Sequence, residues 1–286
     1  MSSRIRLAHL SDIHFFQMDK GISQLFSKNW FGIVNFFLRR KSEFDHSLLE
    51  KCLSLLTEAK VPLALISGDI SCTSSWREFA KGELFIENLK NLGIESFVLP
   101  GNHDTYTKKS LRQNRFYRSF PSSLAHQKVY AKELTDSWWL IALDTTLPTP
   151  PLCCHGSFSE DLEKELEKTL LTLPQGVNII LANHFPLSVD GKGKALKREQ
   201  ALLDLCRRHP NIRLYLHGHT HKQTIYDGRS EGLPILVDAG SVVHKFEGGW
   251  HLIDCEKDSC TIVPFRYKNG QWSPLPKKTF SWSSHE

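Results

Sequence analysis

Residues 5–14 read IRLAHLSDIH, a short apolar run that ends at Ser11 and is followed at once by Asp12 and His14. A continuous apolar run of this kind is typical of a strand buried on both faces. Asp12 and His14 are two residues apart, so on an extended backbone their side chains project from the same face and can share an ion. The stretch therefore predicts a buried strand with half of a metal site at its end.

Similar runs recur along the chain, and four more of them end in residue types that bind metals. They are PLALI before Gly68-Asp69, ESFVL before the block 101–104 (GNHD), VNIILA before Asn183-His184, and IRLYL before the block 217–221 (HGHTH). In open α/β sheets, ligands bind at the carboxyl ends of the strands. Each block alone indicates only a turn, because Gly, Asn and Asp are common in turns. Five such blocks rich in His indicate one shared site.

Helical patterns lie between these runs, with apolar residues three and four apart at about 45–59, 76–91, 159–172 and 194–208. Alternating strands and helices indicate the α/β class. After residue 222, short strand-like runs with Gly-containing turns predict a meander or a second sheet that closes the fold. We therefore expect two packed mixed β-sheets flanked by helices.

The domain organisation is expected to be simple. We predict a single domain over 1–267 that contains an aromatic-rich insertion at about 21–41. The tail, residues 268–286, is predicted to be irregular, because it lacks periodicity and its Pro residues argue against a helix.

Composition limits the classes of partner. The 36 basic and 31 acidic residues give a formal net charge of +5, which is too small and too scattered to indicate specific nucleic-acid binding. Seven cysteines without a CxxC pair suggest reduced thiols in a cytoplasmic protein. We see neither a signal peptide nor an apolar stretch of about 20 residues, the length needed to span a membrane. The oligomeric state stays open.

The ordered blocks DIH, GD, GNHD, NHFP and GHTH resemble the five signature blocks of the calcineurin-like metallophosphoesterase superfamily, including its compact bacterial members of the cyclic-nucleotide phosphodiesterase type. The resemblance implies an α/β/β/α sandwich with two metal ions. One ion would be held by four residues: Asp12, His14, Asp69 and His221. The other would also be held by four: Asp69, Asn102, His184 and His219. Asp69 would then bridge the two ions.

The chemistry of the residues agrees with this division. One carboxylate can span two cations about 3.5–4 Å apart, and the two ions can share a hydroxide that attacks phosphorus. Two divalent ions with Asp12, Asp69 and the hydroxide would leave a formal charge of roughly +1, which attracts an anionic phosphoester substrate. Nitrogen and oxygen ligands without thiolates favour manganese, iron or zinc, and the sequence does not distinguish among these metals.

His103 belongs to neither set of ligands. The resemblance assigns it as the proton donor to the leaving group or as a stabiliser of charge in the transition state. Asp104 is expected to orient its imidazole, as a carboxylate commonly does. The alternative for His103 is a structural hydrogen bond.

Residues 21–41 read GISQLFSKNWFGIVNFFLRRK and are unusually rich in aromatic residues. One interpretation is a helix that caps the core next to the site. The other is an interfacial helix or lid, because a basic end on an aromatic helix suits anionic lipid surfaces. The second interpretation predicts, through about 22–41, peripheral contact with the inner face of the membrane or contact with a lipid substrate.

The leading hypothesis is hydrolysis of a phosphodiester or pyrophosphate bond, because a general acid such as His103 helps most when the leaving group is poor. One alternative is hydrolysis of a lipid-linked nucleotide sugar such as UDP-diacylglucosamine. Another is a non-catalytic scaffold with the same fold. Such a scaffold would typically have lost metal ligands or the GNHD histidine, whereas this sequence retains them.

Overall fold

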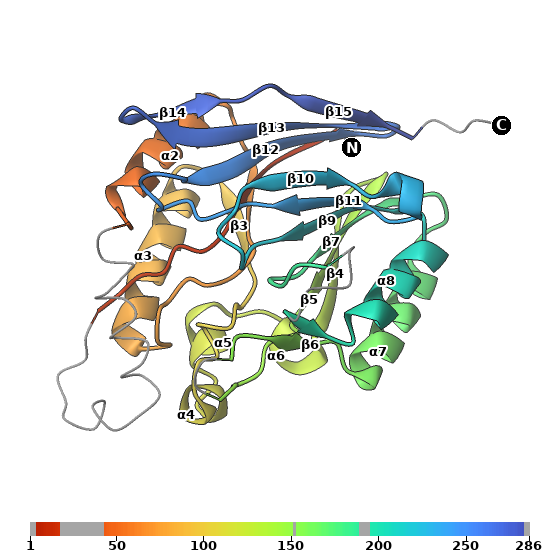
Figure 1. Cartoon of the computed structure of the whole chain (residues 1–286), viewed down its shortest axis with the longest axis horizontal. Coiled ribbons are helices and arrows are strands. Elements are labelled where there is room, and N and C mark those ends of the chain that lie inside the picture. The colour runs from red at the N-terminus through yellow and green to blue at the C-terminus, as the bar shows by residue number, and fades with distance from the viewer. Residues whose placement is uncertain (1–3, 18–42, 151–152, 189–194, 283–286) are drawn as a thin grey trace.

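Two β-sheets pack face to face and carry helices on their outer faces in the computed structural model (Figure 1), which describes residues 4–17, 43–150, 153–188 and 195–282. The predicted α/β fold with two mixed sheets flanked by helices is confirmed.

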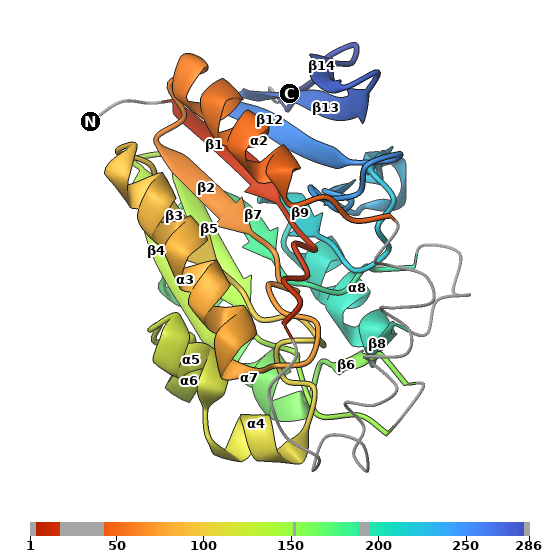
Figure 2. The ribbon, with the colours of Figure 1, turned by 90° about the vertical axis from the view of Figure 1, so that its left-hand side faces the viewer.

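The first sheet has the strand order β14-β13-β12-β1-β2-β3, and β15 also pairs with β13. Its parallel half consists of three strands: β1 (Ile5–Leu10), β2 (Leu63–Ile66) and β3 (Glu95–Val98). Its antiparallel half consists of four: β12 (Gly249–Glu256), β13 (Ser259–Lys268), β14 (Gln271–Pro274) and β15 (Lys278–Ser281). Helices α2 (Ser47–Glu58) and α3 (Trp76–Asn91) lie over β1, β2 and β3 in Figure 2.

The second sheet has the order β10-β11-β9-β7-β5-β4. Its inner strands run parallel: β11 (Ile235–Asp238), β9 (Ile212–His217), β7 (Asn178–Ala182) and β5 (Trp138–Leu143). Its two edge strands are antiparallel: β10 (Thr224–Asp227) and β4 (Val129–Thr135). Helices α7 (Glu160–Thr172) and α8 (Glu199–Arg208) pack on its outer face.

Apolar side chains form three layers: one on the outer face of each sheet and one between the two sheets. Leu48 of α2 and Phe79 of α3 pack with Ala64 on the outer face of the first sheet. Leu7 and Leu214 belong to the layer between the two sheets. Burial of one such large side chain contributes about 2 kcal/mol. Most residues of β1, β2, β7 and β9 are buried and apolar, and polar residues of the kinds that bind metals follow just beyond their carboxyl ends, where the site lies.

The strands after residue 222 agree with the prediction only in part: β12, β13 and β14 form a meander, but the strands do not form a sheet of their own. β10 and β11 extend the second sheet, whereas β12 pairs with β1 and begins the antiparallel half of the first sheet. The prediction of an irregular tail is wrong for residues 271–274 and 278–281, which form β14 and β15. Trp272 and Phe280 are buried there and anchor the two strands, and Pro274 is tolerated because β14 is an edge strand.

Several short elements carried no periodicity in the sequence. They are α4 (Lys108–Arg112), α5 (Arg115–Ser119), α6 (Leu124–Gln127), β6 (Gly156–Ser157), β8 (Leu196–Lys197) and the 3-10 turn η3 (Arg229–Glu231). The aromatic-rich insertion predicted at about 21–41 lies outside the described residues. No helix in the described part of the chain is both long and apolar enough to span a membrane.

Candidate metal centre

Five loops meet at one end of the two sheets, and they follow β1, β2, β3, β7 and β9. The loop after β1 is tied to the loop after β2 by a backbone hydrogen bond of 3.0 Å from Asp12 to the carbonyl of Gly68. A matching bond of 3.0 Å from Gly218 to the carbonyl of His184 joins the loops after β9 and β7. The polar residues that follow these five strands therefore lie close together in the fold, as predicted.

The backbone of the candidate ligands is unusual. Left-handed φ angles occur at five of them: Asp12 (54°), His14 (49°), Asp69 (55°), His219 (73°) and His221 (58°). This conformation costs roughly 1–2 kcal/mol for a residue with a Cβ atom. Strain of this kind concentrates at functional sites, where the surrounding structure holds it in place.

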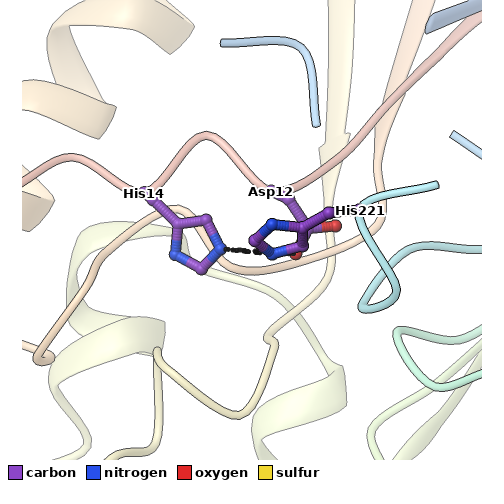
Figure 3. Close-up of side chains that lie close together, drawn as sticks. All are labelled: Asp12, His14 and His221. Atoms are coloured by element: carbon purple, nitrogen blue, oxygen red, sulfur yellow. Dashed lines mark hydrogen bonds and ion pairs between the residues drawn. The ribbon is translucent and has the colours of Figure 1, made fainter. Parts of the chain in front are cut away.

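Asp12, His14 and His221 form one cluster of ligand atoms (Figure 3). Oδ1 of Asp12 lies 3.1 Å from Nε2 of His221 and 3.4 Å from Nε2 of His14, and the two imidazole nitrogens are 3.0 Å apart. Oδ1 is buried, and the described residues offer it no well-formed hydrogen bond. A buried carboxylate oxygen facing two imidazole nitrogens has the geometry and chemistry of a site for a divalent cation.

A second cluster joins Asp69, Asn102, His184 and His219. Nε2 of His184 lies 3.4 Å from Oδ2 of Asp69 and 3.2 Å from Oδ1 of Asn102. The same amide oxygen lies 2.9 Å from Nδ1 of His219. Nδ1 of His184 donates a hydrogen bond of 2.7 Å to the carbonyl of Ser67. Burial acts to lower the pKa of this imidazole, but the negative charge of Asp69 outweighs it and raises the pKa to about 9. Nε2 therefore carries a proton that a bound metal would replace.

Asp69 lies between the two clusters. Its Oδ2 is 3.7 Å from Nε2 of His14 and thus faces ligand atoms of both clusters. Asp69 also belongs to two groups of side chains whose ligand atoms all lie within 4.8 Å of one another, one with Asp12 and His184 and one with His14 and His103. The position suits a carboxylate that bridges two ions.

The electrostatics keep both carboxylates ionised. Burial acts to raise the pKa of Asp12, but His221 and His14 outweigh it and hold that pKa well below its usual value. Burial also opposes ionisation of Asp69, yet the positive potential of His184 and His103 lowers its pKa. Both side chains are thus available as anionic ligands, which is the form that a metal requires.

Two glycines allow the ligands to approach one another closely. A Cβ atom on Gly101 would lie 2.1 Å from Oδ1 of Asp69, and one on Gly218 would lie 1.9 Å from Oγ of Ser11 and 2.5 Å from Oδ2 of Asp12. Any larger residue would displace a candidate ligand. The site therefore requires glycine before Asn102 and before His219.

His103 reaches the same place from the loop after β3. Its half-buried ring stacks on Tyr106 with centroids 5.3 Å apart and meets the ring of His14 edge-on at 4.9 Å. Nδ1 donates a hydrogen bond of 2.6 Å to the carbonyl of Cys72. The imidazole is thereby fixed beside the two clusters.

Asp104 does not orient His103, which corrects the prediction. Its buried carboxylate accepts hydrogen bonds from the backbone of Gly101 (2.9 Å), Ile70 (3.1 Å) and Ser71 (2.8 Å) and from the hydroxyl of Ser71. Burial, together with the negative charge of Asp69, raises its pKa to about 7. The residue ties the loop after β2 to the loop after β3 and so positions Asp69 and Asn102.

Some neighbours of the site could not be predicted from the sequence. The carbonyls of Ser67 and Cys72 fix two imidazoles, and a backbone carbonyl has no signature in a sequence. Phe44 stacks on His14 with ring centroids 5.4 Å apart and lies 5.9 Å from the ring of His221. Phe44 comes just after the aromatic-rich insertion, and no pattern separates it from the aromatic residues there.

Known proteins resemble this chain in sequence. Residues 5–223 match the family model for the calcineurin-like phosphoesterases. The chain is 25% identical over 167 residues to a 3′,5′-cyclic-nucleotide phosphodiesterase of Nostoc sp., with 57% of each chain covered. It is also 25% identical over 184 residues to a probable glycerophosphodiester phosphodiesterase of Arcobacter nitrofigilis, with 62% of this chain and 63% of that one covered. Both matches thus span less than two thirds of the relative.

Solved structures share the fold. A dimetal phosphatase from Danio rerio superposes with a TM-score of 0.70 at 14% identity and covers 98% of this chain and 99% of its own. A purple acid phosphatase from yellow lupin seeds gives a TM-score of 0.64 at 11% identity, with 98% of this chain and 54% of that chain covered. At such identities the likeness concerns the fold alone.

Proposed function

Because the chain belongs to the calcineurin-like phosphoesterase family, we propose that it hydrolyses a phosphodiester or pyrophosphate bond with the help of two metal ions. The observation that carries this proposal is the position of Asp69 between two clusters of ligand atoms. The two relatives, a phosphodiesterase for cyclic nucleotides and a probable one for glycerophosphodiesters, support the same class of reaction.

The donor set fits two ions. Four residues would hold the first: Asp12, His14, Asp69 and His221. Four would hold the second: Asp69, Asn102, His184 and His219. Nitrogen and oxygen donors of this kind suit manganese, iron or zinc. When bound, the two ions would make a water molecule more acidic and would offset charge on the phosphoryl oxygens.

Among the residues that the structure describes, His103 is the one best placed to donate a proton. Its Nδ1–H is held by the carbonyl of Cys72, and a neighbouring acceptor of this kind also stabilises the imidazolium form. Nε2 is then the nitrogen that can give a proton to the oxygen of the leaving group. The ring stack on Tyr106 limits rotation, so that the donor is oriented before substrate binds.

The proposal is tested by turnover of bis(p-nitrophenyl) phosphate and of p-nitrophenyl phosphate by metal-free protein to which manganese is returned. We expect manganese-dependent cleavage of the diester, and a loss on the order of 10³-fold in Asp69→Asn, which weakens the bridge. Lys168→Gln, a change at an exposed position of α7, serves as the control and should retain the wild-type rate. Two bound ions per chain without turnover of any phosphoester would instead favour the non-catalytic scaffold.

A further inference from the structure

A basic hollow of about 490 Å³ adjoins the candidate metal centre. We define it by six of its lining residues: His221, Lys222, Phe246, Glu247, Arg266 and Lys268. His221 is also a candidate metal ligand, and its side chain is 23% exposed. The hollow therefore shares His221 with the candidate metal centre.

The charges in the hollow are unbalanced. Lys222, Arg266 and Lys268 contribute three positive charges and Glu247 one negative charge, which leaves +2. Within the described ranges, none of the three cations forms an ion pair with a carboxylate. Unpaired cations around a concave surface raise the local concentration of anions.

The hollow also offers an apolar surface. Phe246 is 67% exposed, and Nζ of Lys245 lies 4.9 Å from the centre of its ring. An exposed aromatic ring can stack against a sugar or a base. Arg266 can bind a phosphate through two parallel hydrogen bonds, which a lysine cannot do. The combination suits an organic phosphate better than a simple anion.

We propose that the basic hollow binds a second phosphate group of the substrate, so that the preferred substrates carry a phosphate beyond the bond that is cut. The proposal rests on the proposed function of the metal centre and narrows its substrate class. A hollow that contains a metal ligand favours a group of the substrate over a flat membrane surface as its occupant.

The test compares binding of thymidine 3′,5′-bisphosphate with that of thymidine 5′-monophosphate by calorimetry, with protein supplied with manganese. We expect the wild type to bind the bisphosphate about tenfold more tightly. In the double variant Arg266→Gln/Lys268→Gln the ratio should fall to about one, while the Kd for the monophosphate changes less than about twofold. Raising the salt concentration to about 0.5 M should also reduce the ratio, because the cations are exposed.

Two single variants serve as matched controls. Lys168→Gln removes a positive charge far from the hollow and should leave the ratio unchanged. Glu247→Gln removes the negative charge inside the hollow and should raise the ratio. Equal affinities in the wild type, or a preference that survives the double variant, would overturn the proposal.

Turnover separates this proposal from the proposed function. The substrates are the p-nitrophenyl ester of thymidine 5′-phosphate and the same ester with an added 3′-phosphate. Absence of turnover with both, together with the binding preference, would refute the catalytic function and leave the hollow as an anion site. Turnover of both at equal kcat/KM would overturn the role of the hollow alone. A double variant that loses binding to phosphatidylserine vesicles but keeps its preference for the bisphosphate would point to a lipid surface and overturn the proposal.

Discussion

Oδ1 of Asp69 accepts a hydrogen bond of 2.8 Å from the backbone N–H of His103. The other oxygen of the same carboxylate faces His184 at 3.4 Å and His14 at 3.7 Å. The side chain of Asp69 thus faces both clusters of candidate ligands. It also holds the loop that carries His103, the candidate proton donor. The distance from His103 to a bound phosphoester therefore depends on Asp69.

The role of His103 predicts a dependence on the leaving group. In His103→Ala, kcat/KM for a phosphodiester with an alkyl leaving group should fall about 10²–10⁴-fold, because the alkoxide needs a proton. For p-nitrophenyl esters the loss should be at most about tenfold, since that leaving group is stable as an anion. The measurement is kcat/KM over a series of diesters with leaving groups of increasing pKa. Losses of equal size along the series would contradict proton donation.

Asp104 is predicted to act on stability and on the arrangement of the ligands. Removing its carboxylate in Asp104→Ala leaves the buried N–H groups of Gly101, Ile70 and Ser71 without their acceptor. The free energy of unfolding, measured in urea on metal-free protein, should fall by about 3 kcal/mol. Glu87→Ala, at an exposed position of α3, should change it by less than about 0.5 kcal/mol. Equal stability of the two variants would show that Asp104 does not tie the loops together.

Gly101 is predicted to be essential for metal binding. A methyl group there would lie 2.1 Å from Oδ1 of Asp69, so Gly101→Ala must displace this carboxylate. We expect manganese affinity, measured by calorimetry, to fall at least about tenfold. Gly176→Asn is the control, because a Cβ atom at Gly176 meets open space and Asn tolerates its φ of 77°. Wild-type affinity in Gly101→Ala would mean that Asp69 can move without loss of metal.

Buried histidines predict sensitivity to acid. Burial, together with the charges of His217 and Arg266, lowers the pKa of His251 to about 3 from its ordinary value of 6.5, and neither ring nitrogen of His251 has a hydrogen-bond partner in the described structure. Below pH 6.5 the unfolded chain binds a proton that the folded chain excludes, so stability falls as the pH decreases. At about pH 5 the loss from one such residue is about 2 kcal/mol.

The variant His251→Phe removes this contribution. Between about pH 7.5 and pH 5 its free energy of unfolding should decrease by about 2 kcal/mol less than that of the wild type, as measured by urea denaturation of metal-free protein. His126→Phe, at an exposed position of α6, should show the wild-type pH dependence. A wild-type pH dependence in His251→Phe as well would show that His251 is protonated in the folded state.

The sequence was sufficient to predict the fold class and the convergence of the site. Strands buried on both faces have apolar runs that end abruptly, so the first polar residues, such as Asp12, Asp69 and His184, mark the edge where ligands collect. The structure brings all seven predicted ligands together at that edge. Which ion each one holds stays a prediction.

The division of the last strands between the sheets, the strands of the tail and the role of Asp104 depend on contacts between residues far apart in the sequence. His9 of β1 pairs with His251 of β12, a register that nothing local specifies, so the division of the last strands between the two sheets was not predictable. The two strands of the tail could not be predicted, because the segments that contain Trp272 and Phe280 become strands only by pairing with β13. Asp104 is adjacent to His103 in the sequence, and adjacency suggests that it orients this imidazole. Its carboxylate instead accepts hydrogen bonds from backbone N–H groups of two loops.

If Asp69 bridges two ions, its substitution should change the number of manganese ions bound per chain. Metal-free wild type and Asp69→Asn are loaded with manganese, freed of excess metal and analysed by mass spectrometry. We expect two ions per wild-type chain, with the coupled electron spin resonance signal of a manganese pair. In Asp69→Asn we expect fewer than two ions and no such coupling. A single ion in the wild type, or two coupled ions in Asp69→Asn, would contradict this role of Asp69.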